Sequence, residues 1–166
     1  MSPRLLRLVC LLTAFAVLQE VAVGGLISPP VGSQAQLSNL AHAVSGTVTI
    51  VDEDTVRVDD FTYDGGGPLV YFYLGAEEAD EAFKTGLQIG MKLNGFGVSY
   101  DGTQGPLLVD LPSGETLEGY HAFSVWCVRG EANFGSGTFQ AVAVPEPAGL
   151  SLVLFSLMLM RRPPSH

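Results

Sequence analysis

The chain has 166 residues, enough for one domain of ordinary size, and carries 17 acidic against 8 basic side chains. Four of the basic residues lie in hydrophobic segments at the two ends: Arg4, Arg7, Arg161 and Arg162. Residues 25–144 therefore hold four basic and fifteen acidic side chains, a net charge of −11. Such a surface repels phosphate backbones, which argues against nucleic acid as a partner.

Residues 1–24 have the three-part layout of a secretory signal. Arg4 and Arg7 precede an apolar run over residues 8–18, and the small residues of 21–25 follow it. A buried helix of a cytosolic protein is the alternative, but such a helix would carry a polar face and this one has none. We therefore expect a signal helix over 1–24 and export of the protein from a bacterial cytoplasm.

The middle of the chain predicts short strands separated by turns. Residues 25–41 contain Pro29-Pro30 and no clear period, so we expect a linker or leading arm there. One helix is predicted over 76–86, where good helix formers show no alternation. The predicted strands are 45–51, 55–58, 61–63, 69–74, 91–100, 107–109, 120–129 and 133–140. This spacing favours an all-β fold over 42–140, an antiparallel β-sandwich or barrel-like domain.

The C-terminal residues 141–166 contain a second hydrophobic segment. The apolar run 148–160 would span about 20 Å as a helix, against a hydrocarbon core of about 30 Å. Arg161 and Arg162 follow it at once, and basic residues hold the end of a segment on the cytoplasmic side. We expect a hydrophobic helix here that contacts the membrane transiently.

The order of features in this tail resembles the PEP-CTERM sorting signal. Pro145-Glu146-Pro147 precedes one hydrophobic stretch and a terminal arginine cluster. The resemblance implies that an exosortase-type enzyme in the membrane recognises Pro145, Glu146 and Pro147, while Arg161 and Arg162 act as stop-transfer charges. It also implies localisation in the cell envelope or outside the cell, with membrane anchoring before processing.

Cysteine usage leaves one thiol in the mature domain. Cys10 lies within the signal segment, so Cys127 has no partner for an internal disulfide. In an oxidising compartment, a cysteine of this kind pairs with another chain, reacts as a thiol or holds a bound group. A buried, inert cysteine that packs as a small hydrophobe is the alternative.

Residues 42–139 resemble the DM-thirteen domain, an extracellular module often found beside DOMON domains. The residues that carry the resemblance are His42 to Gly46, Phe61 to Gly65, Pro68, Tyr71-Phe72, Gly75, Leu111-Pro112, Phe123 to Cys127 and Phe134-Gly135. The resemblance implies that Cys127 is a redox centre, either as a free thiol or as the attachment point of a prosthetic group such as haem.

Two histidines are candidates to accompany Cys127. On a strand, His121 and Cys127 share one face with apolar neighbours, and Arg129 follows on that face. Thiolate and imidazole both ligate iron, so His121 is a conceivable second ligand, and His42 is a candidate from a distance. An ordinary structural role for each histidine is the alternative, and no C-x-x-C-H haem-attachment motif is present.

Other clusters of functional groups have two interpretations each. The acidic runs 52–54 and 59–60 have oxygen ligands for calcium, but solvated hairpin turns explain them as well. Trp126 with Tyr71 and Tyr73 predicts either a sugar-stacking platform or buried aromatic packing. No hydrolase motif is present, which argues against a hydrolytic enzyme.

Two functions follow from these observations. The first is an exported electron-transfer or cofactor-binding module centred on Cys127, which requires a redox partner. The second is a structural or adhesive component of extracellular polymer, sorted by an exosortase and in contact with polysaccharide.

Overall fold

The computed structural model describes residues 28–95 and 98–142. The expected signal helix 1–24, the hydrophobic segment 148–160 and the sorting residues Pro145, Glu146, Pro147, Arg161 and Arg162 lie outside these ranges. Within the described residues, no helix has the length and apolar character needed to span a bilayer.

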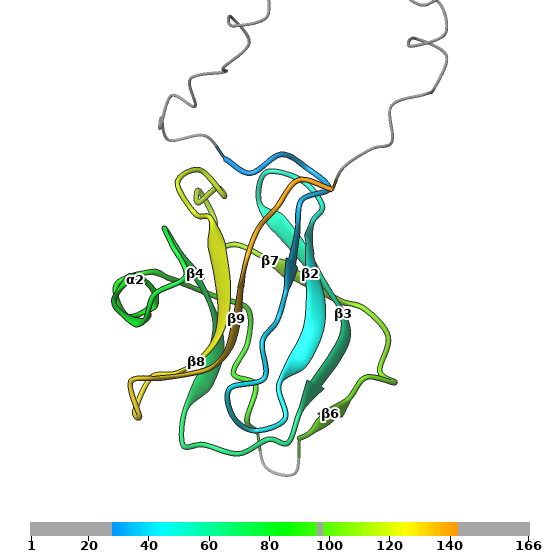
Figure 1. Ribbon diagram of the computed structural model, residues 1–166, viewed down its shortest axis with the longest axis vertical. Helices are drawn as coiled ribbons and strands as arrows, with labels where there is room; N and C mark the ends of the chain where they lie inside the picture. The colour runs from blue at the N-terminus through cyan, green and yellow to red at the C-terminus, as the bar shows by residue number, and fades with distance from the viewer. Residues whose placement is uncertain (1–27, 96–97, 143–166) are drawn as a thin grey trace, which may run out of the picture.

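The described part of the chain folds into two facing antiparallel sheets (Figure 1). The first sheet has the order β1-β2-β3-β6, with β7 also paired to β3, and the second has the order β5-β4-β8-β9. The strands are β1 Gln34–Gln36, β2 Ser45–Ile50, β3 Thr55–Tyr63, β4 Val70–Gly75, β5 Leu87–Ile89, β6 Tyr100–Asp101, β7 Leu107–Asp110, β8 Ala122–Cys127 and β9 Ala132–Thr138. The predicted all-β sandwich is therefore confirmed.

The core lies between the two sheets because apolar residues alternate along the strands. In β2, Val48 and Ile50 are buried while the residues between them are partly exposed, and Val56 and Val58 repeat this pattern in β3. A register shift where β2 pairs with β3 lets Thr55–Tyr63 run as one strand, where the sequence predicts two.

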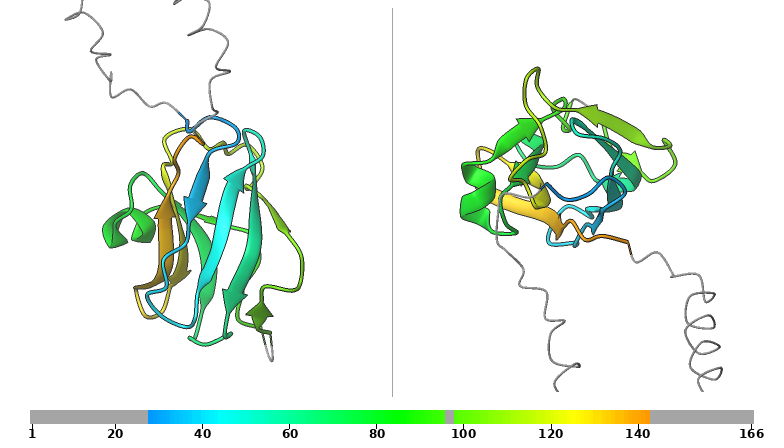
Figure 2. Two further views of the ribbon diagram at one scale, coloured as in Figure 1. Left: turned by 45° about the vertical axis from the view of Figure 1, so that its right-hand side comes forward. Right: turned by 90° about the horizontal axis from the view of Figure 1, so that it is seen from above.

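Strand β8 is buried on both of its faces. Phe123, Val125 and Cys127 point into the core between the sheets. Trp126, on the opposite face, packs against Phe83 of the helix α2, Asp80–Lys84. Figures 1 and 2 show α2 on the outer side of the second sheet. The predicted helix over 76–86 is thus present, but shorter.

Residues 25–41, expected as a linker, contribute a strand that joins the two sheets. Their described part contains β1, which pairs with β2. Gln34 also exchanges two backbone hydrogen bonds with Gln140, just beyond β9. Gly135 and Gly137 permit this approach, because a Cβ at either position would overlap the carbonyl oxygen of Ser38 or Gln36.

The strand predicted over 91–100 is wrong for its described residues. Only Tyr100 belongs to a strand, while Met91 to Gly95 and residues 98–99 form a loop. The Asn94 side chain accepts a hydrogen bond from the Val70 backbone and donates one to the Gly67 carbonyl. These bonds hold the segment against the start of β4, so it does not pair as a ladder.

Candidate functional site

Cys127 ends β8 and lies inside the core. It pairs in register with Val70 of β4 and Ala132 of β9, and only 1% of its surface is exposed. The thiol is free. The following turn closes over it, because a Cβ built on Gly130 would lie 3.3 Å from the Cys127 sulfur. A large partner therefore has no direct access to this thiol.

Tyr63 lies at the same end of the sandwich and is fully buried at the end of β3. Its hydroxyl donates a hydrogen bond to the carbonyl of Gly66. Burial raises the pKa of Tyr63 most, and the charges of Asp64, Cys127 and Tyr100 raise it further. Cys127 pairs with Val70 at the start of β4, and Tyr63 ends β3, the strand before it, so both side chains belong to the core at this end of the sandwich.

His42 packs at the outer edge of this group. Its Nδ1 lies 3.0 and 3.2 Å from the two carboxylate oxygens of Asp64. Its ring centroid is 4.2 Å from that of Phe134 and 6.4 Å from that of Tyr63. The ring occupies this place because position 66 is glycine, and a Cβ there would overlap His42 Nδ1. We call Cys127, Tyr63, His42, Asp64 and Phe134 the end cluster.

A second tyrosine connects the end cluster to the surface. Tyr100 of β6 stacks on Tyr63 with ring centroids 6.5 Å apart and an interplanar angle of 24°. Tyr100 is half-buried, and burial raises its pKa too. The sequence alone did not predict this pair, because the two tyrosines are 37 residues apart and only the fold stacks them.

The two predicted histidine partners differ in position. His121 precedes β8, and six residues of extended chain place it about 20 Å from Cys127. His121 and Cys127 share a face of the strand but lie at opposite ends of it, so they do not ligate one iron. His42 does lie at the Cys127 end, where it contacts Asp64, Tyr63 and Phe134.

A haem does not fit at Cys127 in this arrangement. The thiol is enclosed by packed core residues, and four cavities in the described ranges are all lined by residues other than Cys127, His121 and His42. Those ranges also contain no group of three side chains placed to hold a metal ion. Arg129 is exposed in the turn beyond β8.

Residues 52–54 lie in the hairpin turn offered as the alternative to a calcium site, whereas Asp59 and Asp60 lie within β3 and not in a turn. Asp52 lies in an exposed hairpin turn, where hydrogen bonding, chiefly from the Asp54 backbone N–H, lowers its pKa. Trp126 is only 3% exposed beneath Phe83, so it does not form a sugar-stacking surface with Tyr71 and Tyr73.

Comparison with known proteins identifies the family of this β domain. The family profile described as Electron transfer DM13 matches residues 36–139. The chain belongs to this family. Two curated Drosophila melanogaster relatives, Protein Skeletor isoforms B/C and isoforms D/E, are each 34% identical over 100 residues. The match covers 60% of this chain but only 13% and 7% of those proteins. No solved structure matches.

Proposed function

We propose that this DM13 domain transfers electrons, with Cys127 as its redox residue and the Tyr63–Tyr100 pair as the route to the surface. The observation that carries the proposal is a free, buried thiol at the same end of the core as a tyrosine that stacks on a second, half-buried tyrosine. The name of the family, Electron transfer DM13, supports the same function.

Burial decides how the thiol exchanges electrons. A partner protein cannot touch Cys127, so electrons pass through packed side chains. One-electron oxidation of the thiol by an oxidised partner protein gives a thiyl radical, a proton and an electron. The electron leaves through Tyr63 and Tyr100 to that partner. The Tyr63 hydroxyl donates to the carbonyl of Gly66, and His42 and Asp64 both lie against Gly66. In this proposal, His42 and Asp64 are the groups that take up the proton.

Voltammetry of the full chain tests this function. We expect a reversible wave that disappears in Cys127→Ala and slows in Tyr63→Phe and Tyr100→Phe. Tyr71→Phe is the matched control, because Tyr71 is partly buried but lies on β4 outside the end cluster. A thiol that titrates freely while the protein shows no wave would contradict the proposal.

The setting of the domain is a separate part of the proposal. The terminal segments support export, processing by an exosortase-type enzyme near Pro145-Glu146-Pro147, and an envelope or extracellular location. Intact mass of protein recovered from cells and medium tests it. We expect loss of about the first 24 residues and cleavage near residue 146. An unprocessed mass in both fractions would contradict it.

A further inference from the structure

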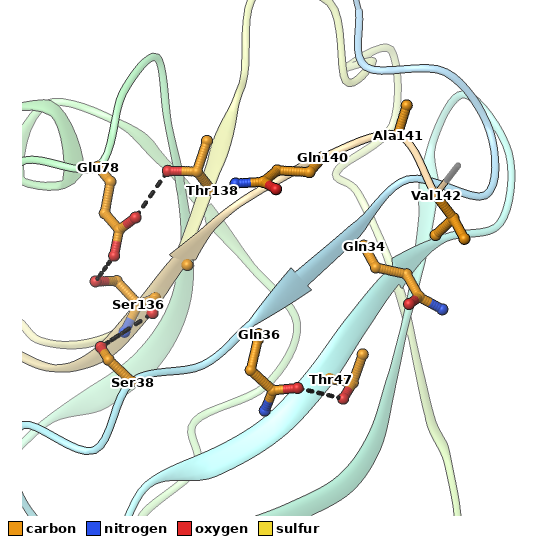
Figure 3. A pocket seen from close by; sticks show the side chains of 11 residues that line it. Gln34, Gln36, Ser38, Thr47, Glu78, Ser136, Thr138, Gln140, Ala141 and Val142 are labelled. Atoms are coloured by element: carbon orange, nitrogen blue, oxygen red, sulfur yellow. Dashed lines mark hydrogen bonds between the residues drawn. The ribbon is translucent and has the colours of Figure 1, made fainter.

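A polar groove lies toward the other end of β9 from Phe134 and the end cluster, where β1 meets β9 (Figure 3). Its volume is about 500 Å³, within the range of small-molecule sites. The floor is formed at Gly137, where the missing side chain brings the β9 backbone against the carbonyl of Gln36. The groove is therefore part of the strand contact that closes the sandwich.

The walls of the groove hold amides and hydroxyls in fixed positions. Thr47 donates a hydrogen bond of 3.0 Å to the Gln36 side chain, whose NH₂ donates to the Gly46 carbonyl. Within the described residues, the Gln34 and Gln140 side chains have no intramolecular hydrogen bond and remain available. These amides offer donors and acceptors in equal measure, as a ligand rich in hydroxyl groups requires.

One carboxylate in the groove is oriented by the protein. The Ser136 and Thr138 hydroxyls donate to the two oxygens of Glu78 at 2.9 and 2.7 Å. Ser136 is itself buried and accepts a hydrogen bond from Asn133. A carboxylate accepts about four hydrogen bonds, so Glu78 keeps acceptor sites for ligand hydroxyls.

The charge of the groove and its apolar end indicate which class of ligand it can bind. The lining contains one carboxylate and no basic residue, and the described ranges carry four basic against fifteen acidic side chains. An anionic polymer would be repelled. Ala141 and Val142, the latter 54% exposed, give one end of the groove an apolar surface for the C–H face of a sugar ring.

We propose that this groove binds a short stretch of neutral polysaccharide, using the Gln34, Gln36 and Gln140 amides and the Glu78 carboxylate. The site is independent of the electron-transfer function, because none of its lining residues belongs to the end cluster. It gives the domain a means of attachment to a glycan polymer.

Titration of the ¹⁵N-labelled full chain with cellopentaose, laminaripentaose and mannopentaose tests the proposal. The side-chain amide signals of Gln34, Gln36 and Gln140 are direct reporters. We expect at least one sugar to shift them saturably, with a dissociation constant of about 1 mM or tighter. Gln140→Ala should weaken this binding about 2- to 12-fold, and Gln36→Ala similarly.

Matched variants separate this site from others. Gln88→Ala removes an exposed glutamine of β5 outside the groove and should leave the affinity unchanged. Cys127→Ala should also leave it unchanged, so a failed electron-transfer test does not affect this result. The proposal is overturned by no shift with any sugar at about 10 mM, by shifts centred on Gln88, or by equal binding of an alginate oligomer.

Discussion

The end cluster and the groove share strand β9 but have opposite environments. Phe134, near the start of β9, packs on His42 at the edge of a closed aromatic cluster, whereas Thr138 and Gln140 line an open polar surface. The cluster is held by packing and the groove by hydrogen bonds between hydroxyls, amides and a carboxylate. The comparison shows how one strand can support a buried redox residue and an exposed binding surface without shared side chains.

The largest effect is expected from Gly135→Ala, because Gly135 lies between the two regions. Its Cβ would overlap the Ser38 carbonyl and the Val44 side chain, so β9 and residues 38–44 must separate. We expect a loss of about 3 kcal/mol or more in the free energy of unfolding, measured by denaturant titration. Gly105→Ala has open space at a φ of +76° and should cost only about 1 kcal/mol. Equal losses would show that the close approach is not required.

Cys127→Ser should change the end cluster alone. The serine hydroxyl would replace a thiol in an apolar core, which costs about 2 kcal/mol of unfolding free energy when no partner is available. Cys127→Ala, which adds no polar group, should cost about 1 kcal/mol. A stable serine variant with unchanged unfolding would mean that water reaches the site.

Alkaline pH should weaken the end cluster. The pKa of Tyr63 is raised above its usual 10.0 in the folded protein, so above pH 10 the unfolded chain loses the proton first. Stability is then full below pH 10 and falls by up to about 1.4 kcal/mol per pH unit until the folded pKa is reached. Tyr100 adds to this fall in the same direction. Unfolding curves from pH 8 upward, with Tyr63→Phe as the variant that flattens the dependence, measure it.

The smallest effect is expected in the groove. Glu78→Gln keeps the shape of the side chain and lets the hydroxyls of Ser136 and Thr138 reorient, so we expect a loss of about 0.5 kcal/mol. Glu77→Gln, on the neighbouring exposed residue, should change nothing measurable. Thermal unfolding of both variants tests this. A large loss for Glu78→Gln would mean that its charge, and not its hydrogen-bonding shape, holds the edge together.

Alternation and β-branched residues were enough to predict most of the sheets. They located β2, β4, β7, β8 and β9, with β-branched residues indicating β2 and a continuous apolar run indicating β4. They missed β1, because a three-residue strand with one buried alanine carries almost no pattern. They also predicted a strand over 91–100, where the structure has a loop. The side-chain hydrogen bond of Asn94 holds this loop, and a hydrophobic pattern does not reveal such a bond.

The site was predictable only in part for a similar reason. The family resemblance singled out Cys127. The alternation of side chains along a strand placed His121 on the same face as Cys127, but it did not indicate how far apart the two residues lie along the strand. Tyr63, Tyr100 and Cys127 are far apart in the sequence, and strand pairing brings them to one end of the sandwich. The groove likewise depends on β1 and β9, the first and last strands of the domain, lying side by side.

The Gln34–Gln140 contact has a mechanical consequence. It brings the two ends of the described chain to the same pole of the sandwich, as Figures 1 and 2 show. Tension applied through these ends would load the hydrogen bonds between the first and last strands one at a time, since they run across the strands. The domain would then unzip at low force. We therefore expect the fold to resist little tension applied between its two ends.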